Sequence, residues 1–190
     1  SDDPRHLVEV LSALSAQTNA VVLASGDPLW FGIGRILAER LGPERLRFHP
    51  APTCLQLAFA RIGRPWQDAR WVSLHGRDPE PLARELQTRP RALAVLTDPG
   101  RGGADAVRRC LHSSGLEASY QLWLGENLGR ADERMRLIPA DAPLPEPLQP
   151  LLVALLIAKE PSIPNERALP LFGLEDGLYL QHPDHPGLMT

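Results

Sequence analysis

The chain has 190 residues, 43% of them hydrophobic, and a formal net charge of −3, which suffices for one large or two small domains with buried cores. Its 20 basic and 23 acidic residues are interspersed, without a Lys/Arg block that could follow a phosphate backbone, so composition argues against a nucleic-acid partner. The most apolar run, Leu151–Ala158, is far shorter than the roughly 20 residues that span a membrane. We therefore predict a globular protein with no membrane segment.

The first segment with a clear pattern is an amphipathic helix, with apolar residues at helical spacing and no strand before it. Strand-like runs recur after it, at Ala20–Ala24, Leu46–His49, Trp71–Leu74, Ala92–Thr97, Tyr120–Leu124 and Leu151–Ile157. Helical patterns fill most of the gaps between the earlier runs, at Trp30–Arg40, Thr53–Ile62, Pro79–Gln87 and Ala104–His112. This alternation predicts an α/β protein.

The regular alternation ends after Arg130, where Glu133–Ile138 has the pattern of a further strand and Asp141–Pro150 is dense in proline. A mixed, partly antiparallel second sheet is expected there. We place a domain boundary near Gly63–Asp68, which gives an N-terminal α/β subdomain over 1–66, a mixed α/β subdomain over 67–175 and a tail over 176–190.

Residues 22–34 contain the most informative motif, in which an apolar run leads through Ser25, Gly26, Asp27 and Pro28 into a helical segment. Gly26 can adopt backbone angles closed to other residues, Asp27 can accept a hydrogen bond from a ligand, and proline suits the first turn of a helix. The alternative is a turn that only caps the following helix.

Three further loops follow predicted strands, over 50–54, 75–78 and 98–103. Ligands of open α/β sheets bind at the carboxyl ends of strands, so we expect the four loops to share one cleft. Thr53 opens a helix whose free N–H groups can face a ligand, or it serves only as an N-cap. His75 and Arg77 can bind a carboxylate, or they belong to a solvated turn.

Other kinds of site find little support. Loop 98–103 lacks both the P-loop ending and the dinucleotide spacing, so a nucleoside triphosphate is not predicted. Cys54 and Cys110 lie far apart and indicate neither a zinc site nor a disulfide framework; a reducing, cytoplasmic compartment fits them. His182 and His185 have no third ligand nearby, so we predict no metal. Glu126 and Asn127, in the loop after a strand, are interpreted as structural.

Five motifs in order resemble the tetrapyrrole methylase family over nearly the whole chain. They are Leu23–Gly34, Pro50–Cys54 with Leu57–Gly63 and Pro65-Trp66, Ser73–Arg77, Leu96–Asp98 and Gly125–Gly129. The resemblance is strongest to the members that methylate carbon 5 of a precorrin. It implies two α/β domains with S-adenosylmethionine in the cleft between them, and methyl transfer at the precorrin-6/7 stage of cobalamin synthesis.

The resemblance also implies site residues. The methyl donor would contact Ser25, Gly26, Asp27, Thr53, Cys54, Asp98 and Pro99. Asp27 is interpreted as orienting the cofactor, with a role as catalytic base the alternative, and no other catalytic residue is assigned. The substrate carries many carboxylates, and four residues are suggested by charge and loop position to bind them: Arg35, His75, Arg77 and Arg101.

The sequence departs from the family pattern in two places. It begins too late for the family's first strand and glycine-rich loop, and Ser25 replaces the first glycine of the usual Gly-Gly-Asp-Pro. The end, 186–190, resembles the linker to a second methyltransferase domain, and a homo-oligomer is expected. The alternatives are a tetrapyrrole methylase-fold enzyme acting on uroporphyrinogen, another precorrin carbon or diphthine, an inactive scaffold, and a generic nucleotide-binding domain.

Overall fold

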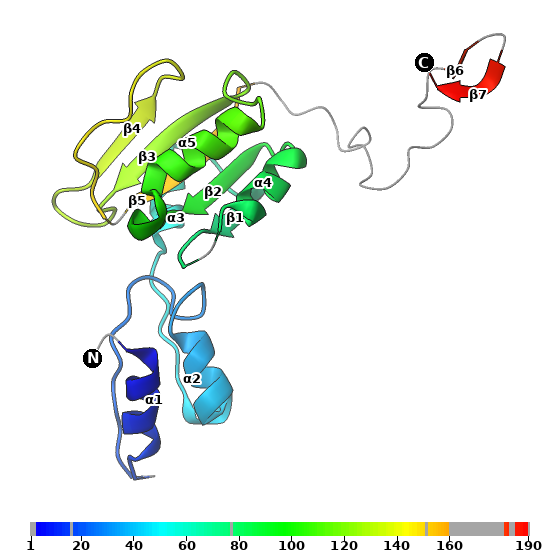
Figure 1. The fold of residues 1–190 in the computed structure, drawn as a ribbon. Coiled ribbons are helices and arrows are strands. Elements are labelled where there is room, and N and C mark those ends of the chain that lie inside the picture. The colour runs from blue at the N-terminus through cyan, green and yellow to red at the C-terminus, as the bar shows by residue number, and fades with distance from the viewer. Residues whose placement is uncertain are drawn as a thin grey trace. The chain divides into compact units, whose positions relative to one another are not determined.

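A computed structural model describes residues 3–15, 17–76, 78–150, 152–159, 181–182 and 185–189 (Figure 1). The chain divides into two compact units, Ser1–Lys159 and Glu160–Thr190. In the second unit, β6 (Gln181–His182) pairs antiparallel with β7 (His185–Met189). The predicted histidine pair and the whole predicted tail, 176–190, fall in this unit, and the histidine side chains lie outside what the structure describes.

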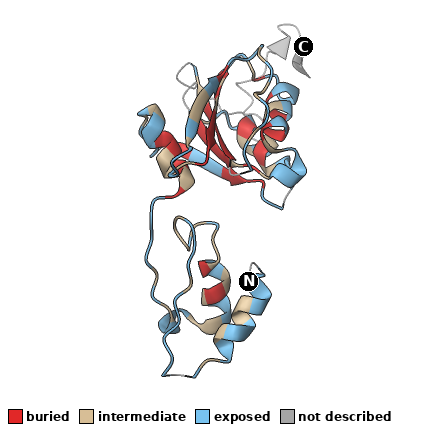
Figure 2. Ribbon diagram, turned by 90° about the vertical axis from the view of Figure 1, so that its left-hand side faces the viewer, coloured by how far each residue is buried: buried red, intermediate tan, exposed pale blue. Residues whose placement is uncertain are grey.

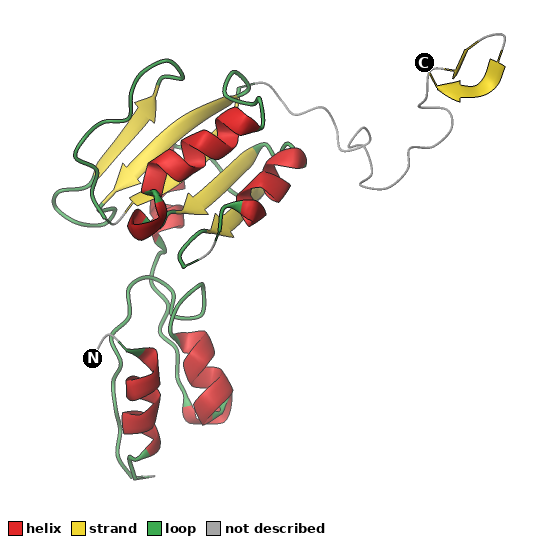
Figure 3. Cartoon of the chain, in the orientation of Figure 1, coloured by secondary structure: helices red, strands yellow, loops and turns green. Residues whose placement is uncertain are grey.

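The first unit contains five described α-helices and two short 3-10 turns (Figure 3). They are α1 (Pro4–Ser12), α2 (Gly34–Leu41), η1 (Pro43–Arg45), α3 (Cys54–Ile62), α4 (Glu80–Gln87), η2 (Pro99–Arg101) and α5 (Gly103–Ser113). Helix α1 confirms the predicted N-terminal helix, and α3, α4 and α5 each begin and end within one residue of their predicted bounds. Local sequence explains α3 well, since Thr53 and Gln56 form a reciprocal capping box and Gly63 ends the helix at a φ of +65°.

A five-stranded sheet forms the centre of this unit, in the order β1-β2-β5-β3-β4. Its strands are β1 (Ala69–Ser73), β2 (Ala92–Leu96), β3 (Tyr120–Glu126), β4 (Arg134–Ile138) and β5 (Leu152–Ala158). Strand β2 is parallel to β1, whereas β5 is antiparallel to both β2 and β3, and β4 is antiparallel to β3. Consequently β1, β2 and β3 run in one direction and end at the same edge. The mixed sheet and the strand over β4 are confirmed.

Helices cover both faces of the sheet, as the buried residues in Figure 2 show. Leu93 and Val95 of β2 belong to the core cluster under α4 and α5, while Ala92 and Ala94 belong to the cluster under α3. Alternate residues of a strand point to opposite faces, so one five-residue strand serves both cores. The small alanine side chains on the α3 side allow that helix to lie close to the sheet.

Two predicted strands are absent, since neither Ala20–Ala24 nor Leu46–His49 has strand structure. Their apolar pattern satisfies strand propensity, but a strand also needs a neighbour that takes up its backbone hydrogen bonds, and no described strand pairs with either segment. The consequence is unusual exposure of apolar side chains, 86% for Val21 and 92% for Leu23.

The helix predicted from Trp30 begins later, at Gly34. The intervening residues form turns instead, because the Trp30 N–H donates to the Asp27 carbonyl over 3.1 Å and the Gly34 N–H donates to the Pro28 carbonyl over 2.8 Å. The Asp27 side chain also accepts from the Leu29 N–H at 2.9 Å. An aspartate that caps a turn in this way competes with helix formation.

An ion pair joins α3 to the loop that follows β3. The Arg61 guanidinium donates to both carboxylate oxygens of Glu133, from Nε and, at 3.0 Å, from Nη2, and Glu133 also accepts from the Gly129 N–H at 2.9 Å. The Arg61 hydrogen bond is the main reason that the pKa of Glu133 falls from its ordinary 4.5 to about 2. This pair therefore ties the α3 side of the sheet to its carboxyl edge.

We expect Glu133→Gln to lower the melting temperature by a few degrees at neutral pH, because the charge-assisted bonds to Arg61 and Gly129 weaken. The folded-state pKa is depressed, so this stabilisation is present above about 4.5 and is lost as the pH falls toward about 2. Thermal melts of both proteins from neutral to acidic pH should show the gap narrowing below about 4.5.

The matched control is Glu39→Gln, which breaks a 2.8 Å pair with Arg35 within α2 whose partners are both more than half exposed. An exposed pair four residues apart contributes little, so this variant should melt close to the parent. Equal losses in the two variants, or a Glu133→Gln gap independent of pH, would contradict the assigned role.

Candidate functional site

The loops after β1 and β2 meet at the carboxyl edge of the sheet, around the Asp98 carboxylate. Asp98 accepts hydrogen bonds from the Gly76 N–H at 2.7 Å and from the Gly100 N–H at 2.9 Å. These bonds, with the Gly76 bond the stronger influence, lower the pKa of Asp98. The side chain is thus an ionised carboxylate that fixes the two loops against each other, and Pro99 opens the 3-10 turn beside it.

The residues predicted to bind substrate carboxylates occupy different settings. The Arg101 guanidinium pairs with the Asp78 carboxylate at 3.0 Å, and both side chains are more than half exposed. His75 is exposed, and its charge contributes to lowering the pKa of Asp98. Arg77 lies outside the described residues. Arg35 lies on α2, where Glu39 holds it.

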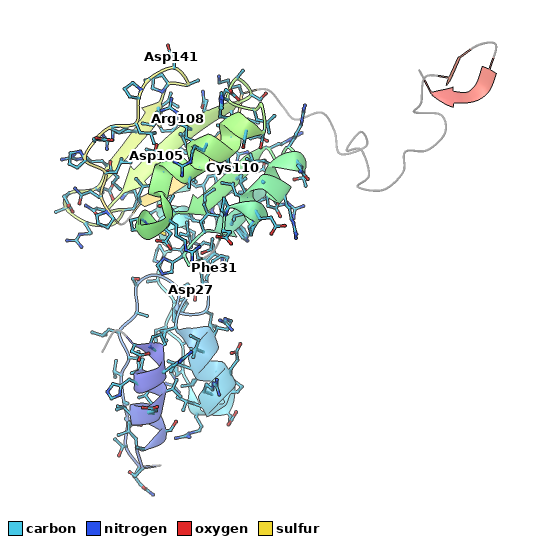
Figure 4. The ribbon with its side chains drawn as sticks, in the orientation of Figure 1. Asp27, Phe31, Asp105, Arg108, Cys110 and Asp141 are labelled. Atoms are coloured by element: carbon cyan, nitrogen blue, oxygen red, sulfur yellow. The ribbon has the colours of Figure 1, made fainter. Side chains whose placement is uncertain are left out.

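A cavity of about 500 Å³ opens beside Asp98 between α4 and α5. Leu74, Asp98, Arg101 and Cys110 are among the residues that line it. Figure 4 shows that Cys110 comes from α5, as do Asp105 and Arg108. Burial raises the pKa of the Cys110 thiol, so it is a neutral wall residue.

The other two predicted loops also meet, where Gly26 lies over the start of α3. Gly26 has a φ of +67°, and a Cβ placed on it would lie 3.4 Å from the Thr53 Cα. The Ala51 N–H donates to the Gly26 carbonyl over 3.3 Å. Two stretches of bare backbone thus approach each other at a helix N-terminus, the geometry that accommodates small anionic or polar ligands.

The side chains around Gly26 differ in how far they are engaged. Ser25 is exposed and Asp27 is half-buried. The Thr53 hydroxyl accepts from the Gln56 N–H at 3.2 Å, so it does cap α3. Burial raises the pKa of Cys54, which keeps that thiol neutral. The structure therefore joins the four predicted loops in two pairs, 25–28 with 50–54 and 75–76 with 98–103.

Sequence reasoning missed a buried charge at the end of β3. Glu126 is fully buried, accepts a hydrogen bond from Arg136 on the adjacent strand β4, and accepts another from the Gln149 N–H at 3.0 Å. Asn127, at a φ of +49°, donates to the Asp132 carboxylate at 2.7 Å. A structural role for Glu126 and Asn127 was expected, but the partners were not, because they lie 10 and 23 residues away for Glu126.

Metal and membrane sites find no basis in the part of the chain that the structure describes. No cluster of three or more His, Cys, Asp or Glu side chains there could bind a metal ion. None of the helices within the described ranges combines the length and the apolar character needed to cross a bilayer.

Known proteins are similar to this chain in sequence and in fold. A precorrin-6Y C(5,15)-methyltransferase (decarboxylating) from Sinorhizobium sp is 37% identical over 98% of the chain, and a cobalt-precorrin-7 C(5)-methyltransferase from Salmonella typhimurium is 35% identical over 64% of it. The chain covers only 43% and 58% of these two relatives.

Two solved structures have the same fold. The methyltransferase CobJ is 22% identical, with a TM-score of 0.64 over 82% of this chain and 70% of its own. Uroporphyrin-III C-methyltransferase from Thermus thermophilus, complexed with S-adenyl homocysteine, is 21% identical, with a TM-score of 0.57 over 81% of this chain and 71% of its own.

The family model of tetrapyrrole (corrin/porphyrin) methylases matches residues 4–142, from α1 to the loop after β4. This range includes both pairs of loops described above. The predicted α/β fold class and the resemblance drawn from the motifs are thereby confirmed, and the chain belongs to the tetrapyrrole methylase family.

Proposed function

We propose that this chain binds S-adenosylmethionine and takes part in methylating carbon 5 of a precorrin during cobalamin synthesis. Family membership and the printed activities of the two relatives support this reaction. The Thermus protein with the same fold was solved with S-adenyl homocysteine, the demethylated form of such a donor. The chain spans only 43% and 58% of the lengths of these two relatives, so the proposed activity is argued from the geometry of the site as well.

The observation that carries the proposal is the close approach of Gly26 to the N-terminus of α3. Without a side chain, Gly26 leaves its backbone bare beside that of Thr53, since even a Cβ placed on it would lie only 3.4 Å from the Thr53 Cα, and a ligand bound there would lie against backbone. An adenosyl group with hydroxyls and a charged amino-acid end fits such a cradle. Ser25, Gly26, Asp27, Thr53 and Cys54 are its proposed contacts, with Asp27 orienting the ligand.

When bound, the donor supplies a methyl group on a positively charged sulfur, which is electrophilic without further activation. The protein's own task is then to align the reactants and exclude water. Asp98 serves alignment, because both of its oxygens already accept backbone N–H bonds that hold the loops after β1 and β2. Pro99, on the same loop as Asp98, is also proposed to contact the methyl donor. A proton must also leave the ring carbon, and accepting it is the alternative role of Asp27.

We further propose that the substrate carboxylates are bound by Arg35, His75, Arg77 and Arg101. Arg101 illustrates how, since its partner Asp78 is 86% exposed and the pair lies in solvent. Such a pair is weak, so a substrate carboxylate can replace the aspartate at small cost. We also propose that the chain has two subdomains, over 1–66 and 67–175, and that its partner is a second methyltransferase domain. The protein is proposed to form a homodimer and to be located in the cytoplasm.

We expect Gly26→Ala to weaken the binding of S-adenosylhomocysteine by about tenfold or more, because the added methyl group fills the cradle against Thr53. Isothermal titration calorimetry of the parent and the variant measures the loss. The control is Gly115→Ala, at nearly the same backbone angle, +64° against +67°, but with open space around its Cβ.

The two variants carry the same backbone strain, so they should lose similar melting temperature while only Gly26→Ala loses affinity. Equal affinity in both would place the cofactor elsewhere. Absence of binding by the parent chain would favour the inactive scaffold.

We expect Asp98→Ala to lower kcat/KM for methyl transfer to cobalt-precorrin-7 by about tenfold or more, since the loops after β1 and β2 lose their common anchor. Asp141→Ala, in an exposed loop, is the control and should retain parental activity. The assay follows labelled methyl groups from S-adenosylmethionine into the tetrapyrrole. Parental activity in Asp98→Ala would show that this anchor is dispensable.

A further inference from the structure

Four aromatic residues gather where the edge strand β1 meets the turn after Asp27, and we call this cluster, Trp30, Phe31, Trp66 and Trp71, the aromatic shelf. The ring of Trp30 lies edge-on to Phe31 at 4.7 Å between centroids and edge-on to Trp71 at 6.3 Å. Trp66 follows at 6.0 Å from Trp71. Three of the chain's four tryptophans thus form one continuous surface.

The aromatic shelf extends the core on the α3 side beyond the edge of the sheet. Trp30 packs against the cluster that includes Ala69 and Phe59. Trp71 is two residues from Ala69 on β1, and therefore on the same face. Among the strands that the structure describes, β1 is at the edge of the sheet, with β2 as its neighbour.

The rings remain open to solvent despite their size. Exposure is 52% for Phe31, 41% for Trp66 and 40% for Trp71, whereas Phe59 at the centre of the same core is 1% exposed. A contiguous apolar surface of this kind is a mark of a binding site rather than of ordinary surface.

Backbone strain at Phe31 is a second, independent indication. Its φ is +51°, in the left-handed region that bulky side chains avoid. The tight turn enforces this conformation, because the Gly34 N–H donates to the Pro28 carbonyl at 2.8 Å and a Cβ at Gly32 would come within 2.5 Å of that carbonyl oxygen. A strained aromatic residue that is half exposed gains nothing for the core, and such strain collects at ligand sites.

We propose that the aromatic shelf is the surface on which the tetrapyrrole macrocycle stacks. The proposal rests on the function proposed above and names the residues that hold the apolar faces of the ring. Aromatic rings bind extended π systems by offset and edge-to-face contact. The carboxylates lie at the rim of a tetrapyrrole, so its faces can bind an uncharged surface while the rim stays in water or meets arginines.

The position of the aromatic shelf agrees with this role. The backbone N–H of its first member, Trp30, donates to the Asp27 carbonyl at 3.1 Å. The aromatic shelf therefore begins one turn from the loop proposed to bind the methyl donor. Figure 4 labels Asp27 and Phe31, which both come from this turn before α2.

Uroporphyrin, a stable tetrapyrrole with carboxylates around its rim, provides the probe, and quenching of tryptophan fluorescence in the full chain reports its binding. We expect Trp71→Thr to raise the Kd for uroporphyrin by about tenfold, and Trp71→Phe to restore most of the affinity. The control is Leu137→Thr on β4, the opposite edge strand, which removes an apolar side chain that is 46% exposed and should leave Kd unchanged.

Two further measurements keep the result interpretable. S-adenosylhomocysteine should bind Trp71→Thr with the same affinity as the parent, which separates the aromatic shelf from the cofactor cradle. If the parent does not bind S-adenosylhomocysteine, the proposed function fails, while the porphyrin titration still reports on the aromatic shelf. Trp66→Ser, in a loop, repeats the test should Trp71→Thr not fold.

Parental affinity for uroporphyrin in both tryptophan variants would overturn the proposal. So would light scattering that shows a dimer falling to monomer in these variants with porphyrin affinity unchanged, because the aromatic shelf would then be an interface between copies of the chain.

Discussion

The antiparallel strand β5 holds the two halves of the five-stranded sheet together. It lies between β2 and β3 and pairs with both along their whole length. Leu155 and Leu156 are completely buried and point to opposite faces, so β5 contributes to both cores. The carbonyl of its first residue, Leu152, also accepts a hydrogen bond from the buried Thr97 hydroxyl at 2.7 Å. This bond fixes the point where the chain leaves β2. With β5 in place, β1, β2 and β3 end at one edge, and the loops after β1 and β2 meet there.

Two different physical devices then shape the site. At the carboxyl edge an ionised carboxylate, Asp98, gathers backbone N–H groups from two loops. At the start of α3 the absence of a side chain on Gly26 allows two backbones to come together. The first device uses charge, and the second uses the close packing of two backbones.

Local patterns in the sequence predicted most of the elements but few of their relations. The apolar run Ala92–Leu96 and the capping residues around Thr53 identify β2 and α3, because the signals lie within the segment itself. Ala20–Ala24 carries the same strand signal and is not a strand, since pairing depends on a neighbour that the segment cannot specify. The place of β5 inside the sheet, the partners of Glu126 and the meeting of Trp30 with Trp71 join residues far apart in the chain. Local reasoning identified each of these residues without finding what it contacts.

The central place of β5 also sets an order on folding. Strands β1 with β2, and β3 with β4, can each pair as soon as they are made, because their partners are neighbours in the sequence. The two pairs join only through residues 152–158, which follow all of them. Until those residues are synthesised, β2 and β3 each present an unpaired, apolar edge, the kind of surface on which nascent chains associate with one another. Assembly of this sheet is therefore a late and non-local event, and the newly made protein depends on completing β5 quickly to stay out of aggregates.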